Sequence, residues 1–520
     1  MSDATQRDAT ESDAAQGQVA NRGIITVCAM VATLMQALDS TIANVALPYM
    51  QGSLSASYDQ ITWVLTSYVV AAAIMTAPVG WLATRFGQKN LYLVSIVGFT
   101  IASMACGIAT SLYEMVLDRL IQGMFGAALV PLSQGTMLNI YPPERRGSAM
   151  AIWGMGVMVG PILGPTLGGY LTDFYNWRYV FFVNLPFGIA ATLGLWFFLP
   201  AEKPRSGLRF DWFGFASLAL GVSGLQLMLD RGEIKDWFGS TEIIIEALIA
   251  GVGFYLFLVQ MVTGKRPFIT PAIFRDRNFV FGLVIMFAIG MVLLASSALL
   301  APWLQELGNY PVNTAGLLLA PRGIGTMLAM MIVGRITNRV DPRLLMGVGV
   351  VLLWWSMTRL SDWTPAVSNW SLAINTIVQG AGIGLIFVPL NVVAFATLPA
   401  QLRYEGTALI SLLRNIGSAI GISIFEALLT NSTQVEHSVL VPFASPLNRA
   451  LQAVPSLSAA TPHGAAVMDQ MINYQAQVIA YNNDYWLMGL LALPLLLLLP
   501  FMARPRGDRG GAGGHAAAMD

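Results

Sequence analysis

Runs of about 20 predominantly apolar residues recur along almost the whole chain, and this recurrence restricts the possible folds more than any other feature. A helix of that length crosses the roughly 30 Å hydrocarbon core of a bilayer. A membrane barrel would instead show strands of about ten residues with alternating polarity, and we find no such pattern. Because backbone polar groups in lipid must pair within their own segment, the sequence predicts an all-α integral membrane protein.

We predict about fourteen transmembrane helices. The expected spans are 24–46, 61–83, 91–109, 115–139, 147–170, 180–199, 211–229, 242–262, 279–301, 314–334, 345–360, 371–395, 406–429 and 485–503.

The composition excludes other classes of protein. Only 11% of the 520 residues are charged, too few to cover a soluble enzyme of this size. The net charge of zero lacks the basic surplus that a nucleic-acid-binding protein needs. Two cysteines, Cys28 and Cys106, lie in apolar runs and form neither a disulfide framework nor a zinc site.

The distribution of Lys and Arg predicts the orientation of the bundle. With fourteen spans both termini share one side, and that side carries about four times as many Lys and Arg as the other. Both termini are therefore expected in the cytoplasm, with residues 1–23 and 504–520 as disordered tails. The longest connection, 431–484, is expected outside, and Gln470–Ala480 within it is a candidate amphipathic helix.

Charges inside the spans are the best guide to function, because a charge at the centre of a bilayer costs about 2.5–3.5 kcal/mol and usually faces the interior of the bundle. The strongest candidates are Asp39 in the first span and Arg119 in the fourth. Further embedded charges are Arg322, Arg414 and Glu426. The alternative is that these charges only pair with one another and hold helices together. All three histidines lie outside the expected spans, so a proton relay would use carboxylates.

The fifth span combines glycines at every fourth position with two prolines. The residues are Gly156, Gly160, Pro161, Gly164, Pro165 and Gly168. Small residues at this spacing let two helices approach closely in lipid. The pattern is compatible with a face that only packs against another helix. The two prolines lack the amide hydrogens that would bond backbone carbonyls, so they favour a closely packed helix that can bend.

The connection after the second span is basic and rich in glycine. Its key residues are Gly80, Arg85, Gly87 and Lys89. An ordinary cytoplasmic turn could have the same composition, yet the spacing of glycine and basic residues recurs in the connection at 334–341. Such an internal repeat is typical of transporters that are built from two related halves.

Together these motifs resemble the major facilitator superfamily, its fourteen-span drug:proton antiporter branch, and most specifically the EmrB-type pumps. The segments that carry the resemblance are Asp39–Pro48, Arg119–Gly123, Gly160–Gly169, Trp177–Gly188 and Leu225–Gly232. Two positions depart from the pattern: Thr84 stands where the loop motif usually has an acid, and Arg322 fits the wider branch better than EmrB-type members.

The resemblance implies two six-helix halves, 24–199 and 279–503, with an inserted helix pair at 211–262. It also implies alternating access, with Asp39, Arg119 and Glu426 in proton coupling, the fifth-span glycines in gating, and the basic loop as a cytoplasmic gate. Apart from protons as the coupling ion, no cofactor is expected. Candidate residues of the substrate cavity are Asn44, Gln122, Gln379 and Asn391.

The resemblance further implies a bacterial inner-membrane location, small hydrophobic substrates, and a tripartite assembly. Its partners would be an EmrA-like periplasmic membrane fusion protein and an outer-membrane channel, with 431–484 either docking the fusion protein or capping the outer vestibule. No nucleic acid is expected. Two alternatives stay open: export of a defined metabolite such as a fatty acid or a siderophore on the same fold, and a passive channel or a receptor that does not transport.

Overall fold

The computed structural model describes residues 21–201, 207, 209–264, 267–337, 339–444 and 461–503. Over these ranges the secondary structure is helical and contains no strand. Among the described residues, thirteen helices are long and apolar enough to cross a membrane, and a bent pair brings the number to 14. The prediction of an all-α bundle with about fourteen spans is confirmed.

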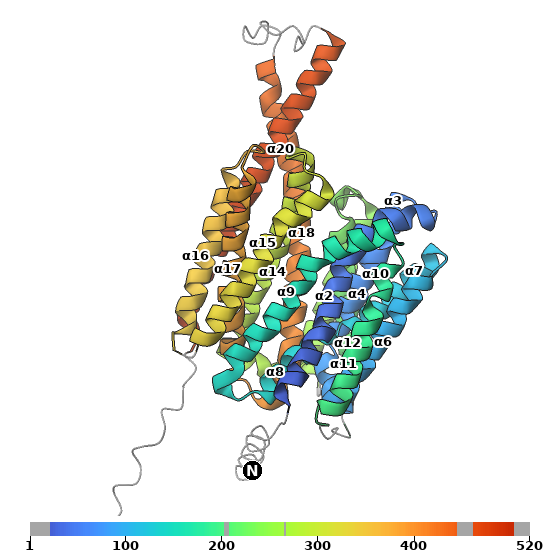
Figure 1. Cartoon of the computed structure of the whole chain (residues 1–520), viewed down its shortest axis with the longest axis vertical. Coiled ribbons are helices and arrows are strands. Elements are labelled where there is room, and N and C mark those ends of the chain that lie inside the picture. Colours follow the sequence, from blue (N-terminus) through green and yellow to red (C-terminus); the bar gives the residue numbers. More distant parts are fainter. Residues whose placement is uncertain are drawn as a thin grey trace, which may run out of the picture.

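The helices fall into three consecutive groups along the chain (Figure 1). The first comprises α2 (Arg22–Ser53), α3 (Tyr58–Ile61), α4 (Trp63–Thr76), α5 (Val79–Phe86), α6 (Gln88–Ile108), α7 (Leu112–Gly126), α8 (Leu129–Ile140), α9 (Pro143–Phe174), α10 (Tyr179–Phe182) and α11 (Asn184–Phe198). The second comprises α12 (Trp212–Arg231), η1 (Trp237–Gly239) and α13 (Thr241–Thr263). The third comprises η2 (Pro271–Arg275), α14 (Arg277–Pro302), η3 (Trp303–Leu307), α15 (Val312–Ile336), α16 (Pro342–Ser361), α17 (Asn369–Ala394), η4 (Ala400–Leu402), α18 (Arg403–Leu440), η5 (Val441–Ala444), α20 (Pro462–Ala492), α21 (Leu495–Leu498) and η7 (Leu499–Phe501).

Two spans are broken at prolines. The predicted span 61–83 is the pair α4 and α5, bent by 58° at Pro78. Proline lacks an amide hydrogen and its ring clashes with the carbonyl four residues earlier, so it ends or bends a helix. The fourth span is likewise divided into α7 and α8, with Pro131 in the first turn of α8.

The first and third groups pack in the same way. In the first, α2 packs against α9 and α11, α7 against α4 and α6, and α6 against α11. In the third, the helices at the corresponding positions repeat every one of these pairings: α14 with α18 and α20, α17 with α15 and α16, and α16 with α20. The groups are therefore two structurally repeated halves. The inserted helices α12 and α13 pack on each other, and α12 also contacts α4 and α18, one helix from each half.

The connection expected as a loop at 431–484 is largely helical. α18 continues to Leu440, and α20 begins at Pro462 and runs without a break to Ala492. No glycine or proline interrupts 431–440, while Thr461 caps α20 by accepting a hydrogen bond from the Gly464 amide. In Figure 1 these extensions project beyond the bundle, on the side opposite the start of α2.

Three stretches of the predicted segments lie outside the described residues: 1–20 of the N-terminal tail, 445–460 of the outer connection, and the whole C-terminal tail 504–520. Helix α2 begins at Arg22, inside the range 1–23 that was assigned to the N-terminal tail.

Candidate functional site

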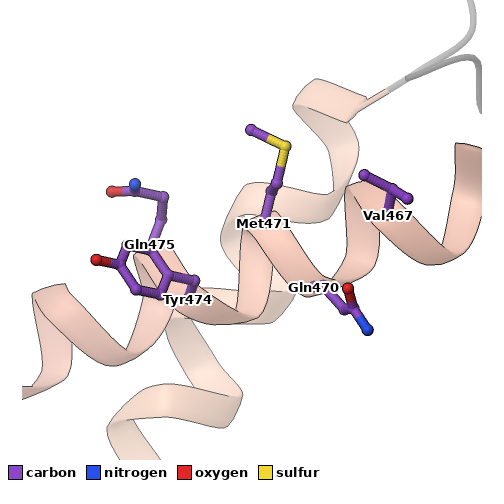
Figure 2. Close-up of a pocket in the computed structure, with 5 residues that line it drawn as sticks. All are labelled: Val467, Gln470, Met471, Tyr474 and Gln475. Carbon is purple, nitrogen blue, oxygen red and sulfur yellow. The ribbon is translucent and has the colours of Figure 1, made fainter. Parts of the chain in front are cut away.

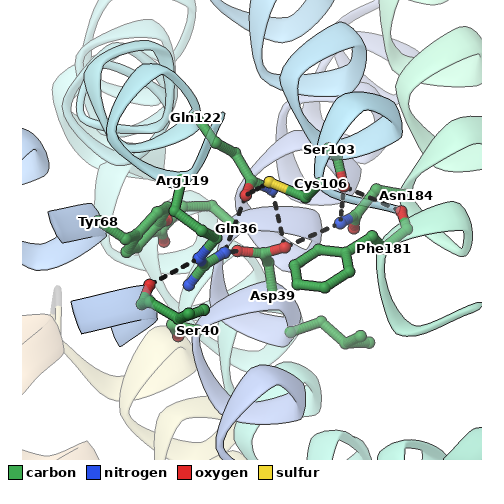
Figure 3. Close-up of polar contacts among 12 residues, drawn as sticks. Gln36, Asp39, Ser40, Tyr68, Ser103, Cys106, Arg119, Gln122, Phe181 and Asn184 are labelled. Atoms are coloured by element: carbon green, nitrogen blue, oxygen red, sulfur yellow. Dashed lines mark hydrogen bonds and ion pairs between the residues drawn. The ribbon is translucent and has the colours of Figure 1, made fainter. Parts of the chain in front are cut away.

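A fully buried ion pair lies inside the first half. The Nη1 atom of Arg119 on α7 is 2.7 Å from Oδ2 of Asp39 on α2, and the two side chains are 1% and 0% exposed. These are the two residues that the sequence placed first among the embedded charges. Figure 3 shows them facing each other between the helices that carry them.

Three neighbouring polar side chains complete the hydrogen bonding of the pair. Gln122 and Asn184 donate amide hydrogens to Oδ1 of Asp39 over 2.8 and 3.1 Å. Nη1 of Arg119 also donates to Gln122 Oε1, and Nδ2 of Asn184 also donates to Ser103 Oγ. A buried ion pair is tolerable only when further hydrogen bonds satisfy its remaining donors and acceptors, and this network supplies them.

Local geometry explains why these side chains converge. Arg119 and Gln122 are three residues apart on α7, so they share one helical face and both reach Asp39. Asn184 is the first residue of α11, on the opposite flank of α2. The carboxylate of Asp39 therefore joins three helices, α2, α7 and α11, at one point.

Aromatic rings cover the guanidinium. Arg119 lies 4.3 Å from the centre of the Tyr68 ring and 5.7 Å from that of Phe181. Its Nε donates to the carbonyl of Val64 over 3.1 Å. In such a dry environment the attraction between the two charges is stronger than it would be in water.

The glycine face of α9 packs directly on the part of α2 that carries Asp39. A Cβ atom added at Gly160 would lie 2.8 Å from Ala37 Cβ and 3.0 Å from the Leu38 amide nitrogen. Added atoms at Gly164 and Gly168 would collide with Thr41 and Ile42, whereas one at Gly156 would meet only the side chain of Met30, most closely at its flexible methyl end. The close packing of α9 thus fixes the backbone on both sides of Asp39.

Side-chain contacts between the halves gather at the end of the bundle where α2 begins. Tyr404 of α18 donates its hydroxyl to Gln88 and accepts a hydrogen bond from Asn139 over 2.6 Å. Thr407 donates to the Pro131 carbonyl over 3.1 Å. Ser148 of α9 donates to the carbonyl of Gly334 on α15 over 2.7 Å. These bonds hold the two halves together on the side of the termini.

The predicted gate loop lies beside these contacts. Gly80 faces the backbone of Glu405, and an added Cβ would come within 2.8 Å of its amide nitrogen. Gly87 has φ 83°, a left-handed conformation that favours glycine, and it separates α5 from α6. Lys89 donates to the Trp196 carbonyl over 2.7 Å, and Arg85 lies in the last turn of α5.

The remaining predicted residues lie apart from the Asp39 network. Glu426 on α18 and Asn44 on α2 are exposed on the bundle. Gln379 and Asn391 are buried on α17, where their amides donate to Ser296 Oγ and to the Phe387 carbonyl. Arg414 lies on α18 and Arg322 on α15, away from Arg119. Of the predicted cavity residues, only Gln122 takes part in the network.

Sequence reasoning assigned no role to several residues of the site. Asn184 lies in the motif segment Trp177–Gly188, but it is 145 residues from Asp39 in the chain, and no sequence pattern indicates that the two side chains touch. No local sequence pattern marks Tyr68, Gln88 or Tyr404 as functional, because the partners of these residues are 48 or more residues away in the chain or lie on other helices. Among the described residues, no group of three or more His, Cys, Asp or Glu is placed to hold a metal ion.

Comparisons with known proteins extend these observations. The family model of the Major Facilitator Superfamily matches residues 29–422. The multidrug export protein EmrB of Escherichia coli (strain K12) is 37% identical over 500 residues, which cover 94% of this chain and 97% of that protein. The fatty acid resistance protein FarB of Neisseria gonorrhoeae is 32% identical, with coverages of 94% and 97%. The solved structure of the proton:xylose symporter XylE shares the fold, with a TM-score of 0.60, 16% identity, and coverages of 92% and 96%.

Replacing Gly160 with valine is expected to separate α2 from α9, because the new side chain meets the backbone of α2. We expect a cost of about 1–3 kcal/mol in stability, a lower midpoint of thermal unfolding, and slower transport. Gly156→Ala is the matched control, since the end of Met30 can move aside. Equal thermal midpoints and transport rates for the two variants would contradict this account of the glycine face.

Proposed function

Because this chain belongs to the major facilitator superfamily and, within it, to the EmrB family, we propose that it exports hydrophobic and amphipathic compounds in exchange for protons. Export proceeds by alternating access, in which the two halves open first to one side of the membrane and then to the other. The protein lies in the bacterial inner membrane with both termini in the cytoplasm, as the distribution of Lys and Arg predicts.

The single observation that carries proton coupling is the buried Asp39–Arg119 pair. The ionised Asp39 binds Arg119, Gln122 and Asn184 at once, and so connects α2, α7 and α11. Protonation removes the charge that strengthens all three bonds, which loosens this junction. A proton that crosses the membrane with 100 mV supplies about 2.3 kcal/mol, enough to bias a conformational equilibrium.

The contacts at the terminal side support alternating access. Tyr404, Thr407 and Ser148 bond across the halves there, so this side is closed in the structure. Opening it requires these bonds to break while α9 moves relative to α15. Since α9 is also packed on the backbone around Asp39, a change of protonation at Asp39 is transmitted directly to a helix of the closed side.

The substrate class follows from the family and the composition. The relative EmrB is named a multidrug export protein, and the chain contains 26 Met, 25 Phe and 13 Trp, whose side chains adapt to varied apolar shapes. FarB, at 32% identity, is named a fatty acid resistance protein. That relative favours one second candidate, a dedicated fatty acid exporter on the same fold.

The projecting ends of α18 and α20 are the proposed docking element for a periplasmic membrane fusion protein, which would hand substrates to an outer-membrane channel. Their surface exposes Val435, Val439 and Met471, which are 52%, 53% and 50% accessible. A pocket of about 320 Å³ lies along one face of α20 (Figure 2). It is lined by Val467, Gln470, Met471, Tyr474 and Gln475. Exposed apolar side chains with polar neighbours are typical of protein interfaces.

Replacing Asp39 with asparagine is expected to abolish proton-coupled export, because the amide cannot change protonation. Purified protein in proteoliposomes should show no substrate-induced proton release, while insertion and folding stay intact. Asp118→Asn, one residue before Arg119 on α7, removes a carboxylate outside the network and should keep coupling. Proton-driven pumping by the Asp39→Asn variant would exclude this residue as the coupling site.

A disulfide across the closed side is expected to stop transport. A Cβ atom at Gly147 would lie 3.3 Å from Cβ of Thr337, close to the separation found in disulfides. Oxidised Gly147→Cys/Thr337→Cys protein in proteoliposomes should be inactive, and a reductant should restore it. The two single cysteine variants are the controls, and full activity of the cross-linked protein would rule out opening at this side.

Deletion of Gln434–Gln477, with a short Gly/Ser linker in their place, is expected to prevent docking. The fusion protein should no longer co-purify with the deleted chain, whereas transport in proteoliposomes should persist because the bundle is intact. If the fusion protein still co-purifies, the projection is not its docking element.

A further inference from the structure

The second half contains a polar cluster that the proposed coupling mechanism does not use. Arg322 of α15 donates from Nη2 to Ser297 Oγ on α14. On the preceding residue of α14, Ser296 Oγ accepts a hydrogen bond from Gln379 Nε2 of α17 over 3.0 Å. Three helices of one half thus form two bonded pairs, Arg322 with Ser297 and Gln379 with Ser296, on adjacent residues of α14.

This cluster is incompletely satisfied. The Nη1 atom of Arg322 and the Oε1 atom of Gln379 are both buried without a hydrogen-bond partner. Within the described part of the chain, no carboxylate lies within 4.0 Å of Arg322, in contrast to Arg119 in the first half. A buried charge without a counter-charge is costly, and most proteins avoid it unless a ligand supplies the missing partner.

The position of Arg322 is fixed by its surroundings. It is the eleventh residue of the 25-residue helix α15, so it lies near the middle of that span. Its carbonyl packs against Gly380 of α17, where an added Cβ would collide with it. The guanidinium of Arg322 extends from this contact between α15 and α17 to Ser297 of α14, although α15 packs mainly on α9 and α17.

We propose that the Arg322 cluster binds the anionic head group of amphipathic substrates, such as a carboxylate or a sulfonate. The inference rests on the proposed export function and specifies a substrate class for it. The free Nη1 hydrogens of Arg322 donate to the anion, and the Ser297 hydroxyl lies beside them. Gln379 Oε1 accepts from a hydroxyl or amide hydrogen that adjoins the head group.

The distribution of charge favours an anion over a cation at this place. No carboxylate of the described residues neutralises Arg322, so the guanidinium repels a cationic ligand and attracts an anionic one. The one carboxylate of the Asp39 network is already bound by Arg119, so it does not neutralise Arg322. The two halves therefore have different binding roles: the first half binds the proton, and the second half binds the acidic substrate.

The test measures equilibrium binding to the purified full chain in nanodiscs, without a proton gradient. The probes are dodecanoate, dodecanol as its uncharged analogue, and tetraphenylphosphonium as a lipophilic cation. Arg322→Gln should weaken dodecanoate binding by about 10–100-fold, the loss of one charged hydrogen-bonded contact, and leave dodecanol binding unchanged. Arg322→Lys should be intermediate, because it keeps the charge and loses the planar fork.

Arg359→Gln is the matched control, since it removes an exposed arginine that stacks on Trp355 of α16. Unchanged dodecanoate affinity in a folded Arg322→Gln protein would overturn the proposal. If that variant does not fold, the native protein provides the test. Equal affinity of the native protein for dodecanoate and dodecanol contradicts the site. A preference for dodecanoate that decreases in the Ser297→Ala variant supports it. The binding assay applies no proton gradient, so its outcome does not depend on whether transport assays show proton coupling.

Discussion

The ion pair between Asp39 and Arg119 is the interaction on which the rest of the structure depends. Removing two unit charges from water inside a bilayer is costly, and the cost is offset only when every donor and acceptor finds a partner. Gln122 and Asn184 supply those partners from α7 and α11. One carboxylate therefore decides how three helices meet, and the glycine face of α9 packs on the backbone around it.

The two halves share their helix pairings but not their electrostatics. Each half brings its first helix against its fifth and its second against its fourth, so the backbone frame is repeated. Within that frame, Arg119 is neutralised by a carboxylate, whereas Arg322 bonds to Ser297 and keeps its charge. A repeated architecture thus gives the chain two polar centres with different chemistry, and the inserted helix α12 contacts both halves.

Much of the fold could be predicted because its determinants are local. Apolar runs give the spans, since the bilayer leaves a helix few alternatives. The bend at Pro78 was not predicted: 61–83 was expected as one continuous span, and the structure divides it into α4 and α5. The long connection was predicted less well: 431–440 and 462–484 continue α18 and α20 as helices that project from the bundle. Polar residues there resembled a loop, although no glycine or proline breaks either helix.

By itself, the sequence determined that the chain is a helical membrane bundle, that Asp39 and Arg119 are embedded charges, and that α9 carries a face of small residues. These properties depend on residues within one helix. Only the tertiary structure decided that Asn184 completes the Asp39 network, that Tyr404 links the halves and that Glu426 lies outside the network. It also decided that no carboxylate in the described part of the chain pairs with Arg322. Those outcomes depend on distances between helices far apart in the chain, which close packing sets and no local pattern records.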